Sequence, residues 1–257
     1  TSEYQLQLGG GSVDGTNTIL GGLWTTSNKI IFDADNVING AAALGDKNYA
    51  SGLIGYTTIF KALALGDLAM FWEKVPAATG QNVSFVDRVQ GFTKAIAAID
   101  NAFSTINADS VSSTFLFNIP PGINLVNSLH ALKARYSLFI GNYAQALSEA
   151  NAVNLTVKST FNFSSVNLNP IFETATSTNN VYAPSGLAMG LPSGLQPDAA
   201  DKRVPFYIST NATAPTYRVS GFGAASLTSW PLYLPGEMTL IKAEAYARQT
   251  PPDLVNA

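Results

Sequence analysis

The clearest pattern in the chain is a series of apolar residues, spaced for one face of a helix, between residues 85 and 107. They follow one another in steps of four and three, which is typical of an amphipathic α-helix. The series is Phe85, Val89, Phe92, Ile96, Ile99, Phe103 and Ile106. Ser84 precedes it and Asp87 follows three residues later, an arrangement like a capping box that predicts a helix start here.

Similar periodicity predicts five further helices, at residues 17–44, 47–74, 123–140, 143–153 and 237–248. Val75-Pro76 ends the second of these, because the residue before a proline avoids the helical conformation. Only Gly141-Asn142 separates helix 123–140 from helix 143–153, so this pair is expected to pack as an antiparallel αα-hairpin. The first sixteen residues are expected to form a loop.

Asp67 interrupts the apolar face of helix 47–74 at a position where an apolar residue is expected. A carboxylate on the buried side of a helix needs a hydrogen-bonding partner. The pattern therefore predicts that Asp67 has a structural partner.

The helical period is lost between residues 154 and 234, where Asn, Ser, Thr, Gly and Pro are frequent. Short pieces at 161–163, 206–208 and 216–219 favour strands. A long irregular stretch in a compact domain is usually functional or disordered. Its many aromatic residues favour an ordered segment.

Composition narrows the possible functions. Charged residues make up only 12% of the chain, and the formal net charge is −3 with 14 Lys and Arg, so a nucleic-acid-binding surface is not expected. Cysteine is absent and His130 is the only histidine, which excludes disulfides, thiol catalysis and multi-histidine metal sites. We expect no metal and no cofactor. The chain contains no run of about 18 apolar residues, so no membrane-spanning helix is predicted.

Candidate catalytic groups are few, and a structural role is favoured for each. His130 and Ser128 are two residues apart on a helix and point in different directions, so His130 is interpreted as a packed or surface residue. Glu237 and Glu244 lie two turns apart on one helix. We interpret them as scaffold contacts to backbone or arginine, not as the paired acids of a glycoside hydrolase.

Two acidic groups could suggest a metal. Asp33 and Asp35 look like the opening of a calcium loop, but the glycine and terminal glutamate of such a loop are missing. A solvated helix face is the preferred interpretation. Asp198 and Asp201 stand beside Lys202-Arg203, which favours a turn or a local ion pair.

Several segments resemble known families. Residues 131–150 (ALKARYSLFIGNYAQALSEA) resemble a tetratricopeptide hairpin, because small and aromatic residues fall where that repeat places them. Residues 231–249 (PLYLPGEMTLIKAEAYARQ) resemble the C-terminal signature of the SusD/RagB family, with Glu237, then Leu240-Ile241, then Ala243 to Arg248. Residues 61–78 (KALALGDLAMFWEKVPAA) resemble a helix end of that family that contains Asp67, and Asp201-Lys202-Arg203 resembles its Asp-x-Arg segment.

The resemblance spans about residues 17–250 in family order, and it implies a fold and a function. The implied fold is all-α: a tetratricopeptide-like, right-handed stack of helix pairs with a long irregular segment over it. The chain is expected to be a single SusD-like domain over residues 1–257, with a scaffold at 17–153, the loop-rich segment at 154–234 and a returning helix at 235–250.

Members of this family are non-catalytic lipoproteins on the surface of the bacterial outer membrane. They bind glycans, or in some branches peptides, for a TonB-dependent transporter. The lipid-bearing cysteine of the family is absent here, and the chain is shorter than usual. It begins at Thr1. We therefore expect a trimmed product or a compact variant, attached to a membrane only through a lipid anchor that these residues lack.

Aromatic side chains are the preferred candidates for contacting a sugar, because a ring can cover the apolar C–H face while amides and charged groups pair with the hydroxyls. The candidates are Tyr182, Tyr217, Phe222, Trp230 and Trp24. Packing is the competing interpretation for each of them, and no position matches a family binding residue closely enough to transfer its role.

The expected function is non-catalytic capture of an oligosaccharide for a SusC-like transporter. The alternatives are a protein–protein scaffold of the tetratricopeptide type, a peptide-binding import component, and, as a third possibility, a hydrolase built from carboxylates.

Overall fold

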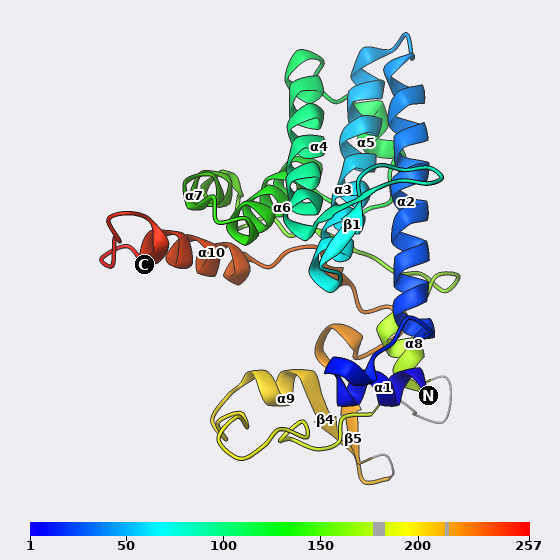
Figure 1. The fold of residues 1–257 in the computed structure, drawn as a ribbon. Coiled ribbons are helices and arrows are strands. Elements are labelled where there is room, and N and C mark those ends of the chain that lie inside the picture. Colours follow the sequence, from blue (N-terminus) through cyan, green and yellow to red (C-terminus); the bar gives the residue numbers. More distant parts are fainter. Residues whose placement is uncertain (177–182, 214–215) are drawn as a thin grey trace. The chain divides into compact units, whose positions relative to one another are not determined.

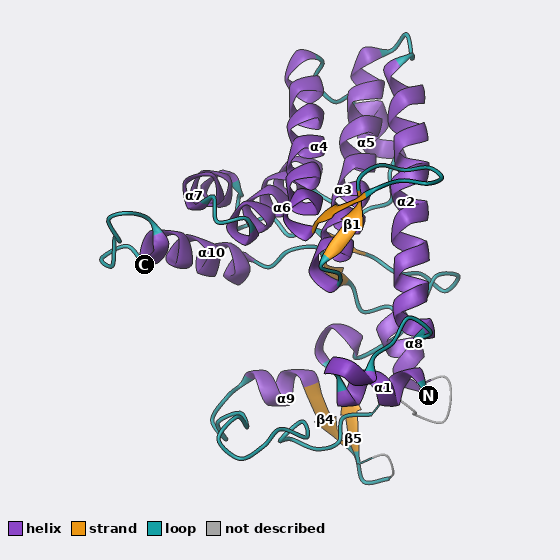
Figure 2. Ribbon diagram, viewed as in Figure 1, coloured by secondary structure: helices purple, strands orange, loops and turns teal. Residues whose placement is uncertain are grey.

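The computed structural model describes residues 1–176, 183–213 and 216–257. The chain divides into two units. The helical unit contains Thr1–Ile119, Asn124–Val157 and Tyr233–Ala257, and the loop-rich unit contains Pro120–Ile123 and Lys158–Leu232. Helices dominate, and the strands in the described ranges form three two-stranded antiparallel pairs (Figure 2). The predicted all-α fold class is confirmed.

Three long helices, α2, α3 and α4, run side by side in the helical unit, with α3 packed against both of the others (Figure 1). The shorter α6 and α7 form a hairpin, and α10 packs on both of them. The elements of this unit are α1 (Ser2–Leu8), α2 (Thr18–Ala42), α3 (Lys47–Phe71), β1 (Lys74–Pro76), β2 (Phe85–Asp87), α4 (Arg88–Ala108), α5 (Ser113–Asn118), α6 (Leu125–Phe139), α7 (Tyr143–Ala152) and α10 (Pro235–Arg248).

Small residues on α3 allow its neighbours to approach closely. A Cβ atom on Gly66 would lie 2.2 Å from the hydroxyl oxygen of Tyr136 in α6, and one on Gly52 would lie 2.3 Å from the ring of Phe115 in α5. Tyr136 and Phe115 are both buried at 2% exposure. The large residue from the neighbouring helix thus fills the space that the missing side chain leaves, which is how a core reaches crystal-like density.

The expectation of no membrane-spanning run needs a correction at α3. This helix is long and apolar enough to cross a bilayer, but more than half of its most apolar stretch is buried inside the unit. Its packing between α2 and α4 explains the apolar composition as that of a core helix.

The α6–α7 hairpin has the predicted two-residue connection. Gly141 adopts a left-handed conformation (φ 76°), and the side chain of Asn142 accepts a hydrogen bond from the backbone N–H of Gln145. The glycine turns the chain at little cost and the asparagine caps α7, so the local sequence explains the turn.

Three local predictions are wrong. Residues 1–16 are not all loop, because Thr1 caps the short helix α1. The predicted helix 85–107 begins at Arg88, since residues 85–87 form strand β2 and the side chain of Asp87, not of Ser84, caps α4 by accepting from the N–H of Val89. The predicted strand at 206–208 is wrong at Phe206 and Tyr207, which end a helix, and right at Ile208, where a strand begins.

The loop-rich unit has little regular structure. Its elements are β3 (Thr160–Phe161), α8 (Pro170–Thr176), α9 (Arg203–Tyr207), β4 (Ile208–Thr210), β5 (Tyr217–Val219), a 3₁₀ turn (Gly221–Gly223) and β6 (Trp230–Pro231). Strand β3 pairs with β6, and β4 pairs with β5. The strand tendencies at 161–163 and 216–219 are thus confirmed in part.

Gly66→Ala tests the close packing on α3. The added methyl group must displace the buried Tyr136 hydroxyl, so we expect the free energy of unfolding to fall by about 1–3 kcal/mol. The matched control is Gly22→Ala on α2, where an added Cβ meets no atom within 4 Å. Helix propensity should make this control neutral or up to about 1 kcal/mol more stable. Chemical denaturation measures both, and equal stability of the two variants contradicts the packing argument.

Candidate ligand-binding site

Four aromatic rings of the loop-rich unit gather into what we call the loop aromatic cluster: Phe206, Tyr207, Phe222 and Trp230. The ring centroids of Phe222 lie 5.3 Å from Phe206, 6.2 Å from Tyr207 and 5.9 Å from Trp230, all in edge-to-face geometry. Phe206 and Tyr207 are also in edge contact at 4.8 Å. Phe206, Tyr207 and Trp230 remain 46%, 45% and 39% exposed. The cluster is therefore held by its own contacts and still presents ring surface to solvent.

A buried asparagine fixes the turn that carries Phe222. The side-chain amide of Asn169 donates to the backbone carbonyls of Phe222 and Thr228, both at 2.7 Å. Its carbonyl oxygen accepts from the N–H groups of Ile171 (2.9 Å) and Phe172 (3.1 Å) at the start of α8. Asn169 has 0% exposure. One side chain thus ties α8 to the 222–228 segment.

Gly221 makes room for the cluster. It has φ 62°, and a Cβ atom at this position would lie 2.8 Å from Cε1 of Phe206. Both the left-handed backbone and the close approach favour glycine.

Polar groups lie near the exposed rings. Strand β6 places Trp230 opposite Phe161. Next to it, Ser229 Oγ donates to Asn162 Oδ1 (2.8 Å), and Asn162 Nδ2 donates to the carbonyl of Pro121 (3.0 Å). Thr160 Oγ1 also donates to Asn162 Oδ1 (2.8 Å), so one N–H of this exposed amide remains for a ligand hydroxyl, at the residue that follows the strand partner of Trp230.

A groove of about 370 Å³ adjoins the other end of the cluster, at Tyr207. Its apolar wall includes Leu191, Leu195 and Val204. Asp201 and Arg203 add an ion pair (Arg203 Nη2 to Asp201 Oδ2, 2.6 Å), which lowers the pKa of Asp201 to about 2. The predicted local pairing at Asp201 is confirmed, and its groups face the same groove as Tyr207.

The structure brings together two of the five predicted ligand-binding aromatics, Phe222 and Trp230. Tyr217 lies on β5, with its ring near Gly186, where an added Cβ would be 3.9 Å from it. Tyr182 lies outside the described residues. Trp24 belongs to the helical unit, where it packs edge-on against Trp72 (5.1 Å) and stacks on Phe85 (6.1 Å).

The sequence does not single out Phe206, Tyr207 or Asn169 as site residues. The first two belong to the strand predicted at 206–208, although an adjacent pair of aromatics in a polar segment is itself a signal for exposed rings. Asn169 is one of many asparagines in this region, and no local signal separates it from the others.

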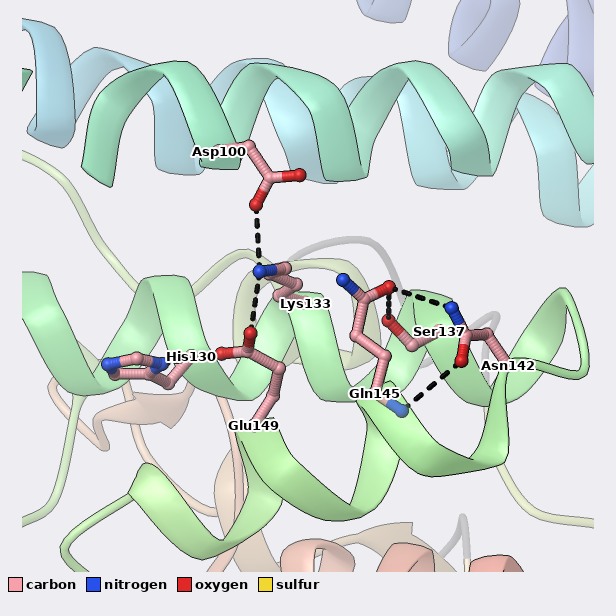
Figure 3. Close-up of polar contacts among 7 residues, drawn as sticks. All are labelled: Asp100, His130, Lys133, Ser137, Asn142, Gln145 and Glu149. Carbon is pink, nitrogen blue, oxygen red and sulfur yellow. Dashed lines mark hydrogen bonds and ion pairs between the residues drawn. The ribbon is translucent and has the colours of Figure 1, made fainter. Parts of the chain in front are cut away.

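The only histidine takes part in a packed polar network in the helical unit (Figure 3). His130 Nδ1 lies 2.6 Å from Glu149 Oε2, and the ammonium of Lys133 bridges Glu149 Oε1 (2.6 Å) and Asp100 Oδ1 (2.7 Å). The ring of Phe103 covers His130 at 4.5 Å. The network joins α4, α6 and α7, so His130 is a packed residue, as predicted.

Burial and pairing act in opposite directions on Glu149. Burial raises the pKa of this carboxyl. The hydrogen bonds and charges of His130 and Lys133 lower it by more than burial raises it, so the net shift is downward. The ionised form of Glu149 therefore stabilises the contact between α6 and α7.

A second network surrounds Asp67. Burial raises the pKa of this carboxyl, and the charge of Arg135 opposes that shift. Arg135 donates to both oxygens of Glu237 on α10, at 2.5 Å and 2.8 Å. The predicted scaffold role of Glu237 is confirmed. Arg135 acts on Asp67 through its charge, and the hydrogen-bonding partner expected for Asp67 stays a prediction.

The other acidic candidates also form ion pairs. Asp33 pairs with Lys29 (2.6 Å) and Asp35 with Lys61 on α3 (2.5 Å). Glu244 pairs with Arg248 (2.7 Å). Asp35 therefore bridges two helices and does not simply face solvent, which corrects the expectation of a solvated helix face there.

The fold is similar to that of a solved structure. A crystal structure of a SusD/RagB family protein from Bacteroides thetaiotaomicron matches with a TM-score of 0.62 and 15% sequence identity. The match covers 88% of this chain and 55% of that one, so this chain spans about half the length of the protein it matches. No family model and no curated protein matches the sequence. The SusD-like fold implied by the sequence motifs is thus confirmed.

Asn169→Ala tests how the cluster is held. The substitution leaves two carbonyls and two N–H groups without this partner, and each unsatisfied buried group costs about 1–3 kcal/mol. We expect a loss of stability of about 3 kcal/mol or more, and faster hydrogen exchange in the 221–229 segment. Asn167→Ala, at an exposed position in the same loop, should change neither. Unchanged exchange in the first variant contradicts the role assigned to Asn169.

Glu149→Gln tests the network in Figure 3. The pKa of Glu149 is lower in the folded protein than in the unfolded chain. Its ionised carboxylate therefore contributes fully to the free energy of unfolding above the unfolded-state pKa, and this contribution is lost as the pH falls through the folded-state pKa. We expect the variant to be about 1–3 kcal/mol less stable at pH 7. The difference from the wild type should shrink below about pH 4.3.

Denaturation curves at several pH values measure this effect. Glu244→Gln, which removes an exposed pair on α10, should cost no more than about 0.5 kcal/mol at pH 7. A pH-independent difference for Glu149→Gln contradicts the stabilising role of the ionised carboxylate.

Proposed function

We propose that this chain is a non-catalytic binding protein that holds an oligosaccharide at the bacterial cell surface and delivers it to a TonB-dependent transporter. The observation that carries the proposal is the loop aromatic cluster. Three of its rings are 39–46% exposed, although each contacts another ring. Preformed aromatic surface of this kind is the main requirement for binding an uncharged sugar ring.

The surroundings of the cluster supply the remaining chemistry. Tyr and Trp combine an apolar face with a polar group, so they can cover a sugar C–H face and still donate a hydrogen bond. Asn162 near Trp230 and the Asp201–Arg203 pair in the groove beside Tyr207 offer both donors and acceptors for hydroxyls.

Delivery to a transporter follows from the proposed kinship with SusD/RagB proteins. The similarity in fold and the motif from Glu237 to Arg248 support that kinship. In this proposal the protein lies on the outer face of the outer membrane, is attached by a lipid anchor that these residues do not contain, and works beside a SusC-like partner. A peptide in place of the oligosaccharide is the alternative ligand within the same role.

A protein–protein scaffold is the second candidate, and a surface of the helical unit favours it. Met70, Val89 and Phe139 are 44–46% exposed and line a shared hollow of about 490 Å³ with Arg88 and Phe92. Exposed apolar residues that gather in this way commonly mark a protein interaction site. In the main proposal the same surface is available to the transporter.

Substitutions in the cluster test the proposal. Affinity gels that contain starch, xyloglucan, arabinoxylan or β-mannan identify the polysaccharide that retards the chain. For that polysaccharide, Tyr207→Ala and Trp230→Ala should each weaken binding about tenfold, as truncation of an aromatic hot spot does.

Phe117→Ala is the matched control, because Phe117 is 89% exposed in the helical unit and outside the cluster. It should leave binding unchanged. Retardation by none of the four polysaccharides, together with capture of a TonB-dependent transporter, favours the scaffold. Cleavage of a labelled oligosaccharide excludes both non-catalytic functions.

A further inference from the structure

The helical unit contains a pocket that the proposed function does not use. Its volume is about 350 Å³, which is within the range of small-molecule sites. It lies among α2, α3, α4 and the loop after β1. Its apolar floor is formed by Ile31, Leu65, Leu68 and Val75, and each of these residues is no more than 8% exposed.

Two lysines and one carboxylate contribute the charges of this pocket. Asp35 Oδ1 pairs with Lys61 at 2.5 Å, and the hydroxyl of Thr79 donates to Asp35 Oδ2 at 3.4 Å. This acid therefore balances Lys61. The lining residues retain one further positive charge, that of Lys94.

Lys94 is held at the pocket by the backbone of the loop after β1. Its ammonium donates to the carbonyls of Pro76 (3.0 Å) and Ala77. In the part of the chain that the structure describes, no carboxylate lies within ion-pair distance of it. An ammonium has three N–H donors, so one remains for a ligand. Burial lowers the pKa of Lys94, because no nearby acid compensates for the lost water.

We propose that this pocket binds a small organic carboxylate, whose anionic end pairs with Lys94 and whose apolar body lies on the floor of the pocket. A monoanion fits better than a phosphate, because the pocket carries one uncompensated positive charge and Asp35 would repel a second negative charge. The aliphatic floor selects a hydrocarbon body over a sugar ring, which distinguishes this site from the loop aromatic cluster.

The probe is hexanoate, added to the full chain and followed by methyl NMR and by calorimetry. The expected result is saturable binding, with shifts at the methyl groups of Ile31, Leu65 and Val75. Hexan-1-ol, which has the same body without the charge, should bind at least tenfold more weakly. Shifts confined to residues outside the pocket, or no saturation, overturn the proposal.

Variants separate the charge from the cavity. Lys94→Met should weaken hexanoate binding about tenfold or more and leave hexan-1-ol unaffected. Lys29→Met, which removes an exposed lysine of α2 outside the pocket, should bind hexanoate like the wild type. Equal binding by Lys94→Met and the wild type overturns the proposal.

A second variant covers the case in which Lys94→Met fails to fold. Ala97 lines the pocket from an exposed position on α4, so Ala97→Phe fills the space without entering the core. It should weaken hexanoate and hexan-1-ol alike by about tenfold. Undiminished binding of hexanoate by this variant places the ligand elsewhere and refutes the site. The hexanoate results do not depend on polysaccharide binding, because the affinity gels test the loop aromatic cluster in the other unit.

Discussion

The candidate site depends on the hydrogen bonds of the buried Asn169 side-chain amide. In the part of the loop-rich unit that the structure describes, the strands and helices are short, so regular backbone pairing does little to fix the positions of its side chains. Four hydrogen bonds from one fully buried side chain take over that role. Because every one of them goes to the backbone, they set the course of the chain around Phe222, and the ring contacts follow from it.

The helical unit uses its few charges in a different way. Lys133 and Arg135 are two residues apart on α6 and point in different directions, and each pairs with acids on neighbouring helices. These pairs join α6 to α4, α7 and α10, and they involve the side chains, His130 and Glu237 among them, that could otherwise suggest catalysis. In a chain with only 12% charged residues, such paired groups serve packing, and aromatic and amide groups carry the proposed recognition.

The long helices could be predicted from the sequence because their apolar spacing repeats over many turns. The wrong predictions arise where two kinds of secondary structure compete for the same residues. Phe85 fits the helical series of α4, but Lys74–Pro76 pairs with residues 85–87 and draws Phe85 into a strand beside Trp24. In the loop-rich unit, Phe222 and Trp230 could be proposed from residue type alone. Asn169 bonds to backbone carbonyls 53 and 59 positions away, and the rings of Phe206 and Tyr207 meet Phe222 only because the β4–β5 pair folds the chain back between them. No local pattern encodes either set of contacts.

In the proposed function, the loop aromatic cluster contacts the sugar. The chain has three tryptophans, and only Trp230 belongs to the cluster. The most direct measurement is the indole N–H NMR spectrum during titration with an oligosaccharide fragment of the polysaccharide that retards the chain. We expect the Trp230 resonance to move while those of Trp24 and Trp72 stay in place. A shift at Trp24 or Trp72 with Trp230 unchanged would contradict it.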